Sequence, residues 1–291
     1  MWRTLSIRPR DASGGHKLGF MLFVTATPIG NLSDASERLR KVLADAELIA
    51  AEDTRKLRQL ASGIGVKIKA KVISLNDSNE REQVESIAHQ AKTMNVVLVS
   101  DAGMPTISDP GYNLVKQCHQ QGVEVISIAG PSAVVSALSV SGLATDRFCF
   151  EGFIPKKQAE KIKFFENLID QPRTMVFFET APRMVDSLAV AAEVLGDREA
   201  SVSRELTKMF EENITGKLSE IAEEIAQNPR GEMVLVIAGN QANEIDYGEL
   251  VTKVIQLVES GMGLKQAAHE VSENFGGSKR ELYQRALAEK K

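Results

Sequence analysis

The stretch VVLVSDAGMPTISDPGY, residues 96–112, decides the fold that this chain of 291 residues adopts. Its first four residues are apolar, and such an unbroken run predicts a strand buried in a parallel sheet. The run ends abruptly at Ser100, where Asp101 and the small residues around Gly103 begin a loop. Ligands of open α/β sheets bind beyond the carboxyl ends of the strands. The stretch therefore predicts a ligand loop, with an ordinary strand-to-helix connection as the alternative.

The second half of the same stretch predicts the start of a helix. Asp109 is a favourable N-cap residue, and Pro110 suits the first helical position because its φ is already close to helical. The pattern then continues as a helix over residues 112–120. A strand, a loop and a helix thus follow one another, as in one α/β unit.

The same alternation extends to both sides of this stretch and predicts an α/β domain over residues 21–142. Repeated strand-helix order is typical of a parallel sheet covered on both faces. The expected strands are 22–26, 48–51, 71–75, 96–99 and 123–128, and the expected helices are 35–44, 80–91, 112–120 and 132–140.

The remaining residues predict a second α/β domain, 143–240, and a helical tail, 241–291. Two of the later strands are close enough to pair as a hairpin, so a mixed sheet with an antiparallel pair is expected. The strands are expected at 148–153, 174–178, 200–205, 210–216 and, closing the sheet, 233–238, with a helix at 156–168. The tail is expected to form helices at 245–259, 265–275 and 278–288, with Ser278 capping the last.

Composition excludes several classes of protein. The formal net charge is −4, so only a local basic surface is expected to bind nucleic acid. Cys118 and Cys149 are the two cysteines, and neither a disulfide framework nor a metal-ligand spacing follows from them, which indicates a reduced, cytosolic protein. The apolar runs are far shorter than the about 18 residues of a membrane span.

Residues 1–20 have no apolar central region and therefore fail as a signal peptide. We expect them to be a poorly ordered extension, with Met21 as the plausible true start. An upstream start codon or a remnant of cloning accounts for such an extension.

Four loops of unusual composition follow predicted strands. They are TATPIGN (25–31), EDTR (52–55), the loop after residue 99, and AGPSA (129–133). Each loop taken alone is compatible with turn chemistry. Because the carboxyl ends of parallel strands share one edge of the sheet, four such loops together predict a site there. The first loop is not the GxGxxG pattern of dinucleotide-binding proteins.

The motifs TPIGN, AEDTR, SDAGMPTISDPG, SIAGPSA, FEGFIP, FFETAPR, SRELTKMFEE and GEMVLVIAG occur in this order over residues 22–239. In order and spacing they resemble the tetrapyrrole methylase superfamily, and within it the branch that methylates small-subunit ribosomal RNA. The first loop lacks the GxGPGD-type sequence of the tetrapyrrole enzymes, which favours the RNA branch. Asn76 stands where that branch usually has a histidine.

This resemblance implies two α/β domains with a cofactor cleft between them, followed by a small helix-turn-helix-like unit. It also implies a homodimer that uses S-adenosylmethionine to methylate the ribose 2'-hydroxyl of cytidine 1402, in the decoding region of the 16S rRNA of the 30S subunit. The cofactor positions implied by the motifs are Pro28, Val99, Asp101, Gly103, Met104, Ser132, Ala133, Phe178 and Leu206.

The ribose hydroxyl is a weak nucleophile, so an acid or base near it is expected to help. The candidates are Glu52, Arg55, Glu179, Arg183, Arg204 and Glu205. Each pair of them is equally compatible with a structural salt bridge, and no single base follows from the sequence.

Basic side chains in two regions are candidates for contact with RNA phosphates. They are Lys156, Lys157, Lys161 and Lys163 after FIP, Lys208 near the predicted cleft, and Lys279, Arg280 and Arg285 in the tail. A solvated helix face and a helical bundle without a partner are the alternatives. Two other functions stay open: methylation of a precorrin-type tetrapyrrole, and a ribosome-assembly protein that binds RNA without catalysis.

Overall fold

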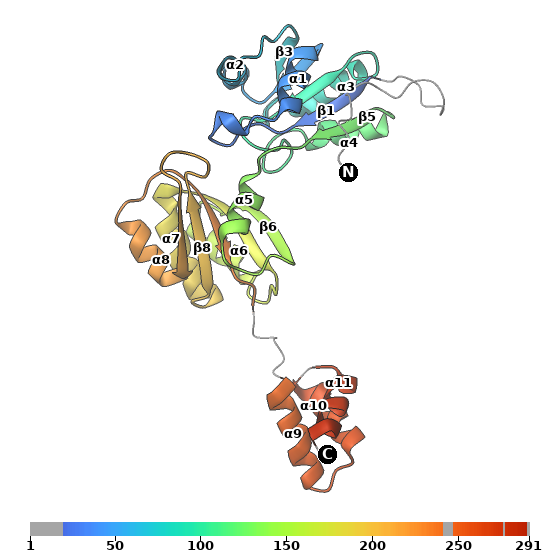
Figure 1. Cartoon of the computed structure of the whole chain (residues 1–291), viewed down its shortest axis with the longest axis vertical. Coiled ribbons are helices and arrows are strands. Elements are labelled where there is room, and N and C mark those ends of the chain that lie inside the picture. The colour runs from blue at the N-terminus through green and yellow to red at the C-terminus, as the bar shows by residue number, and fades with distance from the viewer. Residues whose placement is uncertain (1–19, 241–246, 276, 290–291) are drawn as a thin grey trace. The chain divides into compact units, whose positions relative to one another are not determined.

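The computed structural model describes residues 20–240, 247–275 and 277–289 (Figure 1). The described residues form two compact units. One unit contains residues 20–169 and Arg173–Ala238, and the other contains Asp170–Pro172 and the chain from Gly239 onward. The expected extension at residues 1–20 lies outside the described residues except for Phe20.

The first sheet is wholly parallel, as predicted, with the order β3-β2-β4-β1-β5. Its three central strands are buried along their whole length, which explains why they appear in the sequence as unbroken apolar runs. The strands are β1 (Met21–Thr25), β2 (Leu48–Ala51), β3 (Lys71–Ser74), β4 (Val96–Val99) and β5 (Glu124–Ile128).

Helices cover both faces of this sheet, as expected. Alternate strand residues divide between two cores: Phe23 packs toward α1 and α2, and Leu22 packs toward α3 and α4. The helical elements are a 3-10 turn, η1 (Leu32–Asp34), and the helices α1 (Glu37–Asp45), α2 (Thr54–Gly63), α3 (Glu80–Gln90) and α4 (Tyr112–Gln120). The sequence interpretation missed α2, whose first turn contains part of the EDTR motif.

The predicted N-cap at Asp109 is wrong. Helix α4 begins at Tyr112, and the residue before it is Gly111, with φ 121° and no capping side chain. The free amides at this end are satisfied from α3, since the Glu80 carboxylate accepts from the amides of Gly111 at 2.9 Å and Asn113 at 3.3 Å. Asp109 is thereby left outside the helix.

The second sheet is mixed and has the order β6-β7-β10-β8-β9. Strands β6 and β7 are parallel, and β8 and β9 form the predicted antiparallel hairpin. The last strand was expected to close the sheet, but β10 lies between β7 and β8. Its apolar side chains are covered on both faces, which suits a central strand. The strands are β6 (Phe148–Phe153), β7 (Thr174–Thr180), β8 (Glu199–Arg204), β9 (Glu212–Lys217) and β10 (Glu232–Ile237).

Four helices pack on this second sheet. One face is covered by α6 (Gln158–Glu166), α7 (Ala181–Leu195) and α8 (Leu218–Ala226), of which the sequence analysis predicted only the first. The other face is covered by α5 (Ala133–Val140), where Val134 and Leu138 join a core with Val234. Helix α5 follows β5 of the first sheet and so connects the two sheets.

The second unit holds the three predicted tail helices, α9 (Tyr247–Glu259), α10 (Leu264–Phe275) and α11 (Lys279–Glu289). Val254, Val271 and Leu282 form part of its core. Ser278 caps α11 as predicted, since its hydroxyl accepts from the amide of Glu281 at 3.4 Å. Among the described helices none is both long and apolar enough to cross a membrane.

Candidate functional site

A cavity of about 380 Å³ lies where the carboxyl ends of the first sheet's strands meet the second sheet. Loops after β2, β4 and β5 line one side of it, which is the edge where the sequence predicts a ligand site. The ends of β6 and β7 and the start of β10 line the rest. Its polar lining includes Glu52, Lys56, Asp101, Asp109, Ser132, Glu179 and Glu232, and its apolar lining includes Ile29, Met104, Phe153, Phe178 and Leu206.

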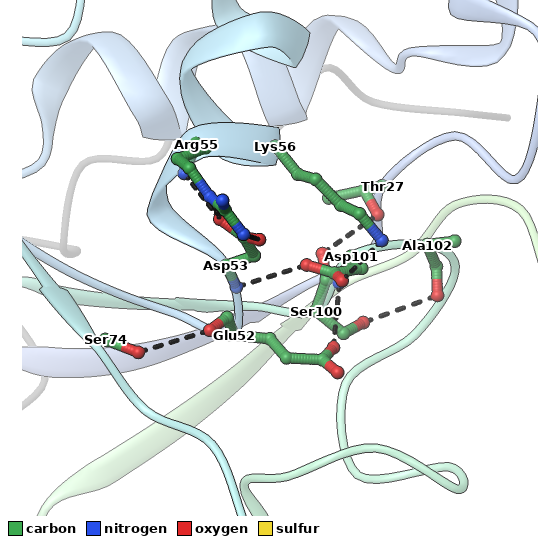
Figure 2. A network of polar contacts seen from close by, with 9 residues as sticks. All are labelled: Thr27, Glu52, Asp53, Arg55, Lys56, Ser74, Ser100, Asp101 and Ala102. Carbon is green, nitrogen blue, oxygen red and sulfur yellow. Dashed lines mark hydrogen bonds and ion pairs between the residues drawn. The ribbon is translucent and has the colours of Figure 1, made fainter.

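Asp101 is the centre of a polar network at this edge (Figure 2). Its carboxylate accepts from the backbone amide of Asp53 at 3.1 Å and pairs with the ammonium group of Lys56 at 2.8 Å. Its own amide donates to the Glu52 carboxylate at 3.1 Å. The loops after β2 and β4 are therefore fixed to each other by side chain and backbone together.

The first loop joins this arrangement through the backbone. Thr27 and Gly103 form an antiparallel bridge, with N–O distances of 2.8 Å and 3.1 Å. Gly103 has φ 77°, a conformation that favours glycine. The backbone beside Asp101 thus lies open to the cavity with no side chain of its own.

Asp109 lines the same cavity, although the sequence interpretation assigned it to a helix cap. Partial burial raises the pKa of its carboxyl to about 6, the charges of Glu52 and Asp101 add to the shift, and a hydrogen bond with Ser100 opposes it. The sequence contained a signal for this residue, because Asp109 is the second aspartate of the motif SDAGMPTISDPG. The Pro-Gly pair that follows it, however, resembled a helix start.

Burial and charge also act on the neighbouring groups. Burial raises the pKa of Glu52, and the charge of Asp101 acts in the same direction. The hydrogen bond to Asp101 raises the pKa of Lys56, so this lysine stays protonated. The wall of the cavity therefore carries several carboxyl groups and one ammonium group, and it suits a ligand with positive charge.

Most of the predicted cofactor positions line the cavity: Asp101, Gly103, Met104, Ser132, Ala133, Phe178 and Leu206. Pro28 and Val99 do not line it. Ile29, which follows Pro28, does line it, and so does Asp101, two residues after Val99. Ser132 precedes α5, and its side chain makes no cap hydrogen bond. Lys56, Asp109 and Phe153 line the cavity and were not anticipated.

Glu179 and Arg183 form a fixed structural pair at the start of α7. The Glu179 carboxylate is buried and accepts from the Thr180 amide at 2.7 Å and the Ser187 hydroxyl at 2.7 Å, and it pairs with Arg183 at 2.9 Å. Arg183 also donates to the carbonyls of Ile154 and Pro155. Glu179 lines the cavity, whereas Arg183 does not.

The other catalytic candidates, Arg55, Arg204 and Glu205, do not line this cavity. Arg55 is exposed and folds over Asp53 at 2.7 Å, outside the cavity lining. Arg204 pairs with Glu212, and Glu205 accepts from Lys208 at 3.0 Å and from the Glu232 amide at 3.0 Å. Arg204 and Glu205 line a neighbouring cavity instead.

The RNA candidates also differ in what holds them. Lys156, Lys157 and Lys163 are exposed, and the first two precede α6. The expectation that Lys161 faces phosphate is wrong, because it is 1% exposed and pairs with Asp186.

The ammonium of Lys208 lies 3.0 Å from Glu205 and 2.9 Å from Glu232. In the tail, Lys279 and Arg280 are exposed at the start of α11. Arg285 is held by Glu281 at 2.6 Å and lies over the Tyr247 ring.

Two family models match this chain. The model of the Tetrapyrrole (Corrin/Porphyrin) Methylases matches residues 21–222, which contain most of both sheets. The model of the RsmI C-terminal HTH domain matches residues 248–290. The fold, the cavity and these matches define a protein of the tetrapyrrole methylase class.

Solved structures agree on the fold. The crystal structure of diphthine synthase superposes with a TM-score of 0.56 at 17% identity, covering 75% of this chain and 89% of that chain. Uroporphyrin-III C-methyl transferase from Thermus thermophilus, complexed with S-adenyl homocysteine, superposes with a TM-score of 0.51 at 18% identity, covering 76% and 97%.

Curated relatives are closer in sequence. Ribosomal RNA small subunit methyltransferase I of Mycobacterium tuberculosis is 42% identical over 269 residues, 91% of this chain and 94% of its own. The protein of that name from Haemophilus influenzae is 40% identical over 92% of this chain and 96% of its own. The chain belongs to the ribosomal RNA small subunit methyltransferase I family.

Proposed function

We propose that this protein transfers a methyl group from S-adenosylmethionine to the ribose 2'-hydroxyl of a cytidine in the decoding region of 16S rRNA. The observation that carries the proposal is the cavity at the carboxyl edge of the first sheet, built by the loops on which the methylase motifs lie. The names of the relatives, at 42% and 40% identity, support small-subunit rRNA as the substrate.

The residues of the cavity fit this cofactor. The carboxylates of Glu52 and Asp101 suit its ammonium and sulfonium charges, and the apolar side chains of Met104 and Phe178 suit its adenine and thioether parts. Gly103 has no side chain, so the cofactor can approach the backbone closely at this point of the cavity. When bound, S-adenosylmethionine supplies an electrophilic methyl group.

The contribution of the chain is to hold the ribose hydroxyl in line and to accept its proton. Orientation alone is worth about 7–11 kcal/mol in well-positioned model reactions. A positioned base adds typically about 10²–10⁴-fold. The acceptor must be a carboxylate of the cavity that is not already committed to the fold.

Asp109 meets this condition best. The Glu179 carboxylate already holds Arg183 and Ser187, and the Asp101 carboxylate holds Lys56 and a backbone amide. The Glu52 carboxylate also holds a backbone amide. Asp109 has a hydrogen bond with Ser100 and a pKa of about 6, so it is ionised at neutral pH yet basic enough to take a proton. We assign it the role of general base.

The helical unit is proposed to contact the RNA. Across Tyr247–Glu259, Leu264–Phe275 and Lys279–Glu289, acidic and basic side chains nearly balance, so the unit is not a generally basic surface. Lys279 and Arg280 are adjacent and exposed at the start of α11. This pair is the feature of the unit that suits a phosphate contact.

The protein is also proposed to act in the cytoplasm as a homodimer. The ribosomal substrate supports the location. Exposed apolar side chains at Val135, Val140 and Phe148 support association of two copies. Sedimentation at several protein concentrations tests the dimer, and a single species of 31.8 kDa contradicts it.

Two assays test the function against its alternatives. Transfer of labelled methyl from S-adenosylmethionine is measured with 30S subunits that lack this modification and, separately, with a precorrin-type tetrapyrrole. Label in the 30S subunits only is the expected result. Label in the tetrapyrrole only supports the other substrate, and absence of cofactor binding by calorimetry supports a non-catalytic RNA-binding protein.

A further inference from the structure

The loop between β8 and β9, residues 205–211, presents two large apolar side chains to solvent. Met209 is 90% exposed and Phe210 is 68% exposed. They are adjacent in the loop, shortly before β9, in the motif SRELTKMFEE. Neighbouring apolar side chains with this exposure are typical of a contact surface, since they contribute nothing to the core.

This loop is built rigidly, which distinguishes it from a loose connection. Glu205 and Thr207 have positive φ values of 51° and 67°, a conformation that non-glycine residues rarely adopt. The ammonium of Lys208 holds Glu205, and the amide of Thr207 donates to Glu211 at 2.7 Å. The strained backbone is thus held by side chains of the loop itself.

An arginine stands beside the exposed ring. The guanidinium carbon of Arg230 lies 5.8 Å from the centre of the Phe210 ring, within cation–π range. Among the described residues Arg230 forms no ion pair. Both side chains line a cavity of about 500 Å³, together with Arg204, Glu205, Met209, Glu211, Glu212 and Gly231.

The carboxylates near the ring are each engaged by a group of the protein. Glu212 is paired with Arg204, and Glu205 is paired with Lys208. Glu211 accepts the amide of Thr207. Arg230 is thus the cation beside the ring that no described carboxylate pairs with, while Glu211 keeps its negative charge.

The surface is continuous with the candidate active site. Gly231 lines both cavities, and the consecutive residues Glu205 and Leu206 line one each. A nucleic acid strand that leaves the candidate active site past Gly231 therefore reaches Phe210.

We infer that Phe210 and Arg230 form a stacking platform for an unpaired base of the RNA strand, next to the nucleotide that is methylated. This inference rests on the proposed function. Aromatic rings and arginine planes bind unstacked RNA bases in this way, and every base has a face that stacks. Met209 lines the same cavity beside the platform.

The first test is binding of a single-stranded decoding-region oligonucleotide to the full chain, measured by fluorescence anisotropy. Phe210→Ala is expected to weaken binding about 5- to 150-fold, the range for loss of one stacked base. Phe210→Trp, which keeps an aromatic ring at this position, is expected to retain the binding of the wild type. Tyr112→Ala, which removes another exposed aromatic side chain, serves as the matched control and is expected to change little.

A second readout identifies stacking directly. With 2-aminopurine beside the target cytidine, the wild type is expected to change the fluorescence of that base and Phe210→Ala to lose this change. Equal binding and equal fluorescence in Phe210→Ala overturn the platform, as does a wild type that binds no RNA. A Phe210→Ala variant that dissociates into monomers while binding RNA normally assigns the surface to a second copy of the chain instead.

These readouts separate the platform from the function on which it rests. Binding that depends on Phe210, without methyl transfer to 30S subunits, overturns the proposed activity alone. Methyl transfer with an unchanged KM for 30S subunits in Phe210→Ala overturns the platform alone.

Discussion

The Asp101 carboxylate lies 2.8 Å from the ammonium group of Lys56, and this contact joins the loop after β4 to the first turn of α2. The same carboxylate accepts from the amide of Asp53, so one side chain connects the loop after β4 to the residues after β2 at two points. The pair is partly exposed to solvent, and an ion pair of this kind contributes little to global stability. Its principal effect is on the shape and charge of the candidate site.

Asp101→Ala is expected to weaken S-adenosylmethionine binding by about 1–3 kcal/mol, the range for a lost buried hydrogen bond, and to leave the fold intact. Titration calorimetry measures the affinity, and circular dichroism measures the fold. Arg55→Ala is the matched control because Arg55 lies outside the cavity lining. An unchanged affinity in Asp101→Ala contradicts a role in cofactor binding.

Asp109→Asn is expected to lower kcat by about 10²–10⁴-fold, because the amide cannot accept the proton of the ribose hydroxyl. The affinity for S-adenosylmethionine is expected to change much less. In the wild type, kcat is expected to fall as pH decreases through about 6, where the carboxylate becomes protonated. A kcat that does not change between about pH 5 and pH 8, a range that includes the pKa of about 6, rules out Asp109 as the general base.

Asp109 also makes the stability of the fold depend on pH, in the opposite direction to kcat. Its folded pKa of about 6 is higher than the ordinary value of 3.8, so the folded state binds a proton more tightly than the unfolded state. Its contribution to stability is therefore present at acidic pH and is lost as pH rises through about 6. Relative to the wild type, Asp109→Asn is expected to gain in Tm from acidic to neutral pH, and a relative loss over this range refutes the assignment.

Gly103→Ala is expected to destabilise the protein by about 1–2 kcal/mol, because φ 77° is unfavourable for a residue with a side chain. A Cβ atom there meets only ordinary contacts, the nearest at 3.4 Å from Ile29, so strain rather than collision is the cause. Urea denaturation measures the change. A variant as stable as the wild type shows that the loop adopts another conformation.

Lys279→Ala and Arg280→Ala together are expected to weaken binding to 30S subunits and to reduce the slope of log K against log salt by about 2, one for each lost phosphate contact. Arg285→Ala is the informative comparison. Since Arg285 contacts Glu281 and Tyr247, its loss is expected to lower the Tm with a smaller effect on the salt slope. An unaltered slope in the double variant excludes phosphate contacts by this pair.

The sequence predicted those parts of the fold in which local pattern and final environment agree. The run at Val96–Val99 was readable because β4 is buried on both faces, and the hairpin of β8 and β9 followed from short separation. The central position of β10 could not be predicted from the sequence, since strand order depends on contacts between distant segments. Helix α2 was missed because few of its residues are apolar and buried.

The candidate site was predicted to the level of loops and less well to the level of side chains. The motif at Asp101 and Gly103 pointed to the sheet edge at which the cavity lies. Asp109 was misread because a Pro-Gly sequence after an acid also fits a helix start, and only the carboxylate of Glu80 on another helix makes such a cap unnecessary. Lys161 was misread because charge alone does not reveal a buried pair with Asp186.

The most direct test of the account is the location of the methyl group. The protein is incubated with labelled S-adenosylmethionine and 30S subunits from a strain that lacks this enzyme, and the 16S rRNA is digested and mapped by mass spectrometry. We predict a single labelled nucleoside, a cytidine of the decoding region that carries the methyl group on its ribose. Label on a base or in another region of the rRNA, or no label while S-adenosylmethionine still binds, contradicts the account.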